Sequence, residues 1–186
     1  MYKKDTKQKL LNAFNALQLT SDFNRITVDD IVKKAGVSRA TFYRHFHDKY
    51  DVMHYNYTLL LNRSLSKHTY TSMEELFVQL LEEGRKQNKE LTVLFSASGV
   101  NSLTAYISRY SYMVARNLYE TGKMSDGLPK KRSITKEQDI QLKLFCNGVA
   151  IFFEEWVKGK HNLRSEEAAR ILYQVLPVDF KGNLWE

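Results

Sequence analysis

The chain has 186 residues and a formal net charge of +7 at pH 7, and Cys146 is its only cysteine. A single cysteine excludes an intramolecular disulfide, and no segment approaches the roughly 20 apolar residues of a membrane span. The charge is uneven, because residues 1–50 carry ten Lys/Arg against five Asp/Glu, whereas the remaining residues carry 18 against 16. We therefore expect a polyanion partner for the first quarter of the chain.

The apolar residues recur at helical spacing along the whole chain, and the only prolines, Pro129 and Pro177, lie late. This pattern predicts an all-α protein of about nine helices. We expect these helices at about residues 5–20, 27–35, 38–46, 48–68, 73–84, 91–97, 103–119, 134–157 and 165–176, with an exposed loop at 121–133. The change in helix content after residue 50 predicts a helix-turn-helix domain at 1–50, joined by a connecting helix to a helical domain at 51–186.

The stretch 27–49 has the caps of two short helices joined by a tight turn. Thr27 is a helix N-cap with Asp30 three residues later, as in a capping box. Gly36 suits a left-handed C-cap, and Ser38 caps the next helix. A helix, a tight turn and a basic aromatic helix predict a helix-turn-helix.

The third helix has one apolar side and one polar side. Phe42 and Phe46, four residues apart, should hold it against the first two helices. The polar side, which a DNA major groove would meet, then carries Arg39, Thr41, Tyr43 and Arg44. The other interpretation is an ordinary solvated face.

Residues AGVSRATFYRHFHDKYDVM, at 35–53, closely resemble the signature of the tetracycline-repressor (TetR) family of bacterial transcription regulators. The positions at the motif's spacing are Gly36, Val37, Ser38, Thr41, Tyr43, Phe46 and Lys49. The resemblance covers about residues 5–60, and it departs from the family pattern where Asp22, Phe23 and Asn24 replace a glycine-aromatic pair. Residues 152–172 look similar to the end of the subgroup labelled dihydroxyacetone-kinase regulator-like.

The resemblance implies a DNA-binding surface made by Thr27, Ser38, Arg39, Ala40, Thr41, Tyr43, Arg44, His45 and Lys49. By resemblance, Tyr43 and Lys49 would bind phosphates, and Thr27 and His45 are further phosphate candidates. The base-edge candidates are Arg39, Thr41 and Arg44, because arginine suits guanine O6/N7 and a threonine methyl suits thymine.

One such head covers half of a palindromic operator, so a homodimer is expected. The expected dimer interface consists of Phe145, Gly148, Val149, Phe152, Phe153, Trp156, Ala168, Ile171, Leu172 and Val175. Alternatively these residues form only intramolecular core. The aromatics expected to line an effector pocket are Phe95, Tyr106, Tyr110, Phe145 and Phe152. Ordinary core is the competing interpretation for each of them.

The sequence thus favours a cytoplasmic transcriptional regulator, most often a repressor, that binds double-stranded DNA under the control of a small molecule or protein partner. The alternative is a helical ligand- or protein-binding module that no longer reads DNA. An enzyme is not expected, because Cys146 lies in an apolar run without a neighbouring histidine. A metal site at His47, Asp51 and His54 needs all three on one helix, and a helix start at Asp48 prevents that. No cofactor or membrane partner is expected.

Overall fold

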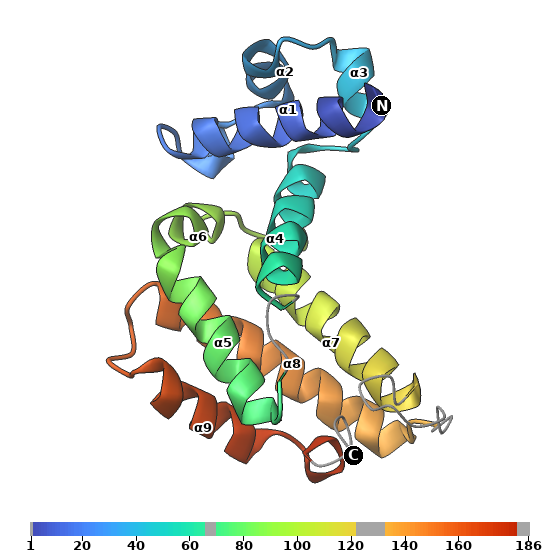
Figure 1. Cartoon of the computed structure of the whole chain (residues 1–186), viewed down its shortest axis with the longest axis vertical. Coiled ribbons are helices and arrows are strands. Elements are labelled where there is room, and N and C mark those ends of the chain that lie inside the picture. Colours follow the sequence, from blue (N-terminus) through green and yellow to red (C-terminus); the bar gives the residue numbers. More distant parts are fainter. Residues whose placement is uncertain (1, 66–69, 122–132, 182–186) are drawn as a thin grey trace. The chain divides into compact units, whose positions relative to one another are not determined.

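The structure is a computed structural model that describes residues 2–65, 70–121 and 133–181, and every regular element in those residues is helical (Figure 1). The α-helices are α1 (Tyr2–Gln18), α2 (Val28–Ala35), α3 (Arg39–Tyr43), α4 (Lys49–Leu65), α5 (Met73–Lys86), α6 (Asn88–Leu94), α7 (Leu103–Thr121), α8 (Lys136–Val157) and α9 (Ser165–Val175). Two 3-10 helices, η1 (Phe23–Arg25) and η2 (Val178–Phe180), complete the set. The all-α prediction is confirmed. The predicted loop at 121–133 lies mostly outside the described residues.

By their contacts the residues form two compact units. Unit 1 comprises Met1–Arg63 and Lys89–Leu103, and unit 2 comprises Ser64–Asn88 and Thr104–Glu186. The contacts therefore group most of α4, and α6, with the first three helices. The functional division predicted at residue 50 stays a prediction.

Unit 1 is built on aromatic packing between α1, η1, α3 and α4. Phe14 and Phe23 are fully buried and meet edge to face, with ring centroids 6.2 Å apart. Phe42 and Phe46 are buried as predicted, with ring centroids 5.9 Å apart. Burial of these rings fixes α3 against α1 and α2, and so leaves the opposite side of α3 exposed.

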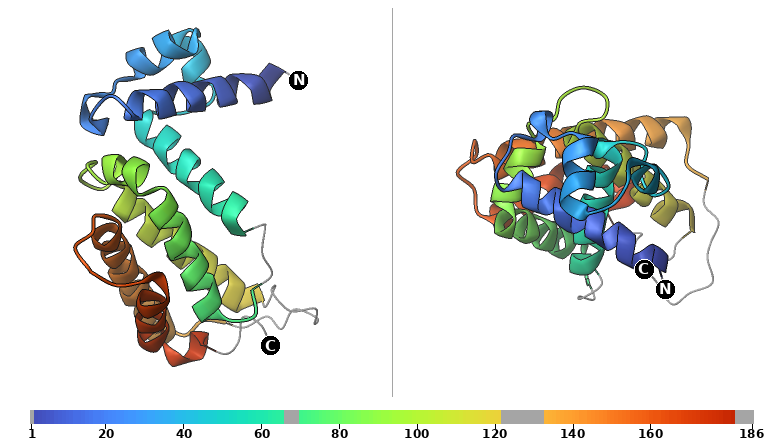
Figure 2. Two further views of the ribbon diagram at one scale, coloured as in Figure 1. Left: turned by 60° about the vertical axis from the view of Figure 1, so that its left-hand side comes forward. Right: turned by 90° about the horizontal axis from the view of Figure 1, so that it is seen from above.

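Unit 2 is a helical bundle in which α5 packs extensively on α9, and the two run side by side in Figure 1 and in the left view of Figure 2. Leu81 of α5 and Ala168 of α9 are among the buried residues of this bundle. Polar pairs that join α7 to α8 include Thr104 with Glu154, Ser108 with Asn147, and Tyr112 with Asp139.

The ends of several helices differ by a few residues from those expected. Gly84 lies inside α5 and does not end it, and a Cβ there would stand 2.7 Å from the ring of Phe153. This glycine is needed for helix packing. Ser165 is the first residue of α9 and is fully buried, with its hydroxyl donating to Glu82, while Arg164 occupies the N-cap position.

Candidate nucleic-acid interface

The start of α2 is fixed by the predicted capping box. The Thr27 hydroxyl accepts from the backbone N–H of Asp30 at 3.2 Å, and the Asp30 carboxylate accepts from the backbone N–H of Thr27 at 2.9 Å. The Thr27 hydroxyl also donates to Asp30 at 2.6 Å. The two hydrogen bonds that the Asp30 carboxylate accepts lower the pKa of Asp30, and the bond from the Thr27 hydroxyl has the larger effect. Thr27 is exposed, but its hydroxyl is already engaged in the cap.

A left-handed turn separates α2 from α3. Gly36 has φ +66°, a conformation that costs a glycine little, and its N–H donates to Lys33 and Val32 carbonyls. Ser38 then caps α3 by accepting from the backbone N–H of Thr41 at 3.1 Å. The sequence therefore fixes the angle between the two helices locally.

The side of α3 away from Phe42 carries the predicted DNA-binding residues. Ser38, Arg39, Ala40, Tyr43 and Arg44 are exposed, whereas Thr41 and His45 are half-buried. Tyr43 is 49% exposed, which is unusual for a large aromatic side chain that serves only packing.

The polar groups of this face are organised among themselves. The Thr41 hydroxyl lies 2.9 Å from that of Ser38 and accepts from Arg44 Nη2 at 3.0 Å. Arg39 Nη1 donates to both carboxylate oxygens of Asp29, at 2.8 and 2.9 Å. The polar side chains of this face are thus hydrogen-bonded to one another, and the guanidinium groups of Arg39 and Arg44 lie at its surface.

Lys49 behaves differently from the rest of the predicted set. Its ammonium donates to three backbone carbonyls of the α1–α2 connection, those of Phe23, Asn24 and Ile26, at 2.9–3.0 Å. Burial lowers the pKa of Lys49. An ammonium has three N–H donors, so all three donors of Lys49 are engaged by carbonyls inside unit 1.

The model of "Bacterial regulatory proteins, tetR family" matches residues 16–55, which include the end of α1, both helices of the helix-turn-helix and the start of α4. Residues 16–55 form a tetR-family domain. The TetR-type head therefore includes the capped turn and the exposed face of α3 described above. No curated protein sequence matches the chain.

Solved structures share the fold over nearly the whole chain. A TetR transcriptional regulator from Streptococcus agalactiae is 20% identical with a TM-score of 0.60, and covers 93% of this chain and 94% of its own. The dihydroxyacetone kinase operon activator DhaS is 14% identical with a TM-score of 0.57, covering 92% and 93%. NalD, a repressor of a multidrug efflux pump in Pseudomonas aeruginosa, is 16% identical with a TM-score of 0.50, covering 93% and 95%. The chain has the fold of a TetR-family transcriptional regulator.

The residues predicted for a dimer interface fall into three groups. Trp156, Ala168 and Leu172 are buried within the chain. Gly148, Ile171 and Val175 are exposed, and Phe145, Val149, Phe152 and Phe153 are half-buried. Three further apolar residues of α8 are also exposed, which are Ile140, Leu144 and Ile151, at 48%, 68% and 55%.

The five aromatics predicted for an effector pocket have different surroundings within their units, and the pocket stays a prediction. Phe95 is buried in unit 1, and Tyr106 and Tyr110 of unit 2 stack on each other with centroids 5.8 Å apart. Phe152 stacks on His161 at 5.3 Å. Phe145 lies near Phe77, with centroids 6.2 Å apart, and lines an open groove.

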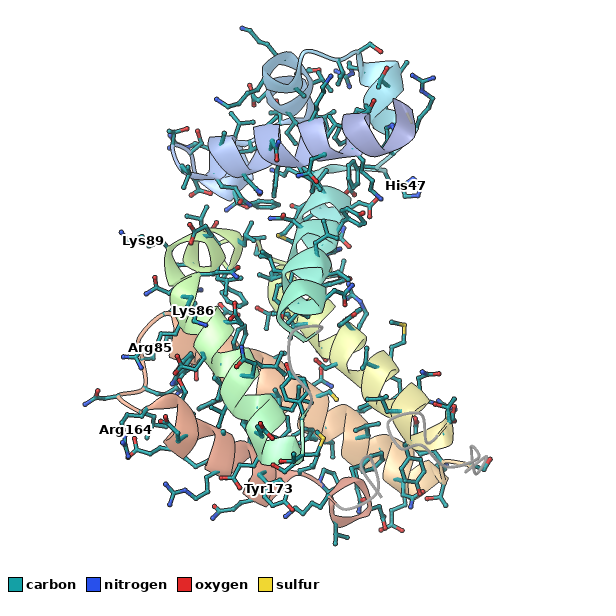
Figure 3. The ribbon with its side chains drawn as sticks, viewed as in Figure 1. His47, Arg85, Lys86, Lys89, Arg164 and Tyr173 are labelled. Atoms are coloured by element: carbon teal, nitrogen blue, oxygen red, sulfur yellow. The ribbon has the colours of Figure 1, made fainter. Side chains whose placement is uncertain are left out.

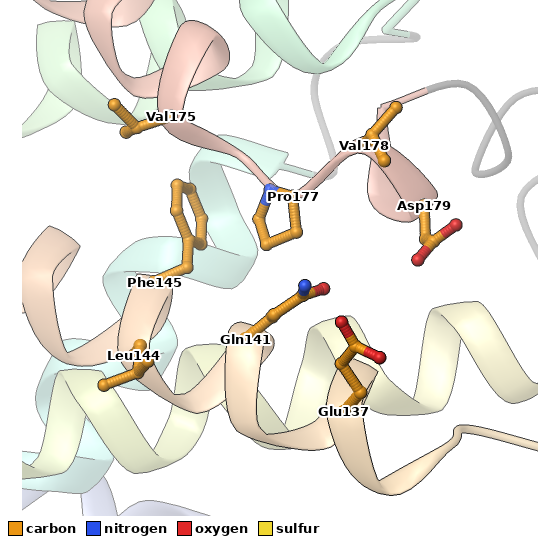
Figure 4. Close-up of a pocket in the computed structure, with 8 residues that line it drawn as sticks. All are labelled: Glu137, Gln141, Leu144, Phe145, Val175, Pro177, Val178 and Asp179. Carbon is orange, nitrogen blue, oxygen red and sulfur yellow. The ribbon is translucent and has the colours of Figure 1, made fainter.

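That groove, of about 510 Å³, lies between α8 and the α9–η2 segment (Figure 4). Its residues are Glu137, Gln141, Leu144, Phe145, Val175, Pro177, Val178 and Asp179. Its border is apolar and exposed: Val175 and Val178 are 62% and 78% exposed.

The competing chemistries find little support in the described residues. Burial raises the pKa of the Cys146 thiol to about 12, so it is protonated at neutral pH and a poor nucleophile. No group of three or more metal-binding side chains occurs in the described parts of the chain. His47 precedes α4, which begins at Lys49, and Figure 3 shows its ring directed away from the ribbon. Among these residues no helix is long and apolar enough to cross a membrane.

Proposed function

We propose that the chain is a transcriptional regulator that binds a palindromic DNA operator as a homodimer, with Ser38–His45 entering the major groove. One observation carries the proposal: a capped tetR-family helix-turn-helix presents Arg39, Tyr43 and Arg44 on one exposed face. Arg39 and Arg44 supply donors for base edges or phosphates, and the Tyr43 hydroxyl supplies a donor for a phosphate.

The homodimer is proposed through α8 and α9. Leu144, Gly148 and Ile151 recur at helical spacing on α8, and Ile171 and Val175 do so on α9, and all five are exposed. Leu144 and Val175 line the same groove, and monomeric proteins rarely leave large apolar patches exposed to solvent. A second copy would cover it and hold two heads roughly 34–36 Å apart, or at a related spacing, as successive major-groove faces require.

A small molecule or protein partner at the C-terminal domain is proposed to control DNA affinity. It can do so only by binding better to one conformation of the dimer than to another. Repression is the proposed sign, because a dimer that occupies an operator within a promoter blocks transcription without any further contact. This function places the protein in the cytoplasm of a bacterium, with no enzymatic activity.

The test measures binding of the full chain to duplex DNA from its own promoter region, at several salt concentrations. Wild-type affinity should fall steeply with salt, and Arg39→Ala combined with Tyr43→Ala should remove specific binding. Lys86→Ala, an exposed change on α5 of unit 2, is the control and should bind as wild type does. A flat salt response of the wild type would instead favour a helical binding module that does not read DNA. A promoter-reporter fusion with and without the protein gives the sign of regulation.

A further inference from the structure

An exposed ion pair connects the two helices of the helix-turn-helix. Arg39, the first residue of α3, donates from Nη1 to both oxygens of Asp29, in the first turn of α2, and both side chains are about 60% exposed (59% and 63%). Ion pairs this exposed contribute little to folding stability. Stabilising the fold is therefore a weak reason for this contact.

The contact leaves one edge of the guanidinium available. Arginine has five N–H donors, and the two neighbouring oxygens of Asp29 both accept from Nη1. Nη2 donates one of its two N–H groups to the Tyr43 hydroxyl in a long hydrogen bond of 3.5 Å, and Nε makes no hydrogen bond with the described residues. The Nε–H and the adjacent Nη2–H point the same way, so they form the parallel pair of donors that suits guanine O6 and N7.

The position of Asp29 is otherwise unfavourable for a DNA-binding head. A carboxylate beside the recognition helix repels phosphates, and residues 1–50 carry only five acidic residues. The capping box of α2 uses Asp30, which already supplies an acidic group to the first turn. Besides its place in the first turn of α2, the local role of Asp29 is its contact with Arg39.

We propose that Asp29 is a positioning residue for sequence recognition, which holds Arg39 so that its free edge reads guanine at one base pair of each half-site. The inference rests on the proposed function, since it requires α3 to enter the major groove. An arginine held in place before binding loses less side-chain freedom on reaching the base, so the correct base pair is favoured more strongly.

The experiment selects binding sites for the full wild-type chain from random duplex DNA, then measures binding to the selected duplex and to its single base-pair substitutions. We expect Asp29→Asn to reduce the preference for guanine at one position of each half-site by about five- to tenfold, near the low end of one arginine–guanine pair. Preferences at other positions and the salt dependence should not change. Affinity for unrelated DNA should stay the same or rise, because one repulsive charge is lost.

The matched control is the same change in an Arg39→Ala background, where Asp29→Asn should no longer alter any base preference. The proposal is overturned if Asp29→Asn leaves every preference unchanged. It is also overturned if the variant binds the selected duplex more selectively, because Asp29 would then compete with DNA for Arg39. A wild-type protein that selects no consensus would overturn the proposed function, and this inference with it. An unchanged thermal unfolding midpoint confirms that the variant is folded.

Discussion

Lys49 gives the sharpest separation between a structural role and a DNA-binding role, because the TetR resemblance assigns its side chain to a phosphate. In the structure its ammonium holds three carbonyls of the η1 region, two of them in part-buried contacts. Lys49→Met keeps the length of the side chain and removes these charged hydrogen bonds. Each such bond contributes about 1.5–3 kcal/mol, but the carbonyls can bind water once the ammonium is gone. We therefore expect a loss of roughly 2 kcal/mol in the free energy of unfolding.

The assay is urea unfolding at fixed protein concentration, together with DNA binding at several salt concentrations. Lys34→Met is the control, since Lys34 is exposed on α2 and its ammonium makes no hydrogen bond with the described residues. Lys34→Met should lower the free energy of unfolding by well under about 1 kcal/mol, which is the upper end of the range for one charge near a helix terminus. If Lys49 instead neutralised one phosphate per head, the slope of log affinity against log salt would shrink by roughly 1.8 for the dimer. A stable Lys49→Met variant with that reduced slope would refute the structural role.

Three further predictions follow from unit 2. In analytical ultracentrifugation, Leu144→Glu should sediment as a monomer. Leu19→Glu in unit 1, at a matched 71% exposure, is the control and should remain a dimer. A dimer in both variants contradicts the proposed interface. Cys146, with its pKa raised to about 12, should react with iodoacetamide at pH 8 far more slowly in the native protein than in urea, and equal rates contradict its burial. Hydrogen bonds from Lys143, then Tyr112, lower the pKa of Asp139. Its contribution to stability should thus be complete above its unfolded pKa and be lost as pH falls below about 4, so Asp139→Asn should flatten the acid side of a melting-temperature profile.

The elements predicted well from sequence are those whose determinants are local. The Thr27 capping box, the Gly36 turn and the Ser38 cap each depend on residues within four positions, and all three occur as predicted. Gly84 was expected to end a helix, and its real role depends on Phe153, which is 69 positions away in the chain. No local pattern contains that contact.

The surface of α8 shows a second limit of sequence patterns. Its segment LFCNGVAIFF is apolar on several sides of the helix, so periodicity cannot separate the side facing the core from the side facing solvent. The structure buries Leu142, Cys146 and Ala150 and exposes Leu144 and Ile151. The choice between these two sides depends on where the neighbouring helices lie, and that information is tertiary.

Charge counting overstates the number of cations available to DNA. The ammonium of Lys7 lies 3.5 Å from the ring centroid of Tyr55 and 5.1 Å from that of Phe46, so it contributes to packing between α1 and α4. Lys49 is bound to carbonyls, and Asp29 offsets the positive charge of Arg39, although Arg39 Nε makes no hydrogen bond with the described residues. The net charge agrees with the proposed DNA partner, but it does not identify the cations that would meet it.

The departure from the family pattern at Asp22, Phe23 and Asn24 has a structural explanation within unit 1. Asp22 caps η1 by accepting from the backbone N–H of Asn24 at 2.7 Å, and Phe23 is fully buried. The Asn24 amide donates to the Ser96 carbonyl at 3.1 Å, and the Ser96 hydroxyl donates to Asp22 at 3.4 Å. A glycine-aromatic pair could supply the buried ring but neither of these side-chain contacts. The three residues thus attach the segment after α6 to the same connection that Lys49 holds, so a shift of that segment would act directly on the base of the helix-turn-helix.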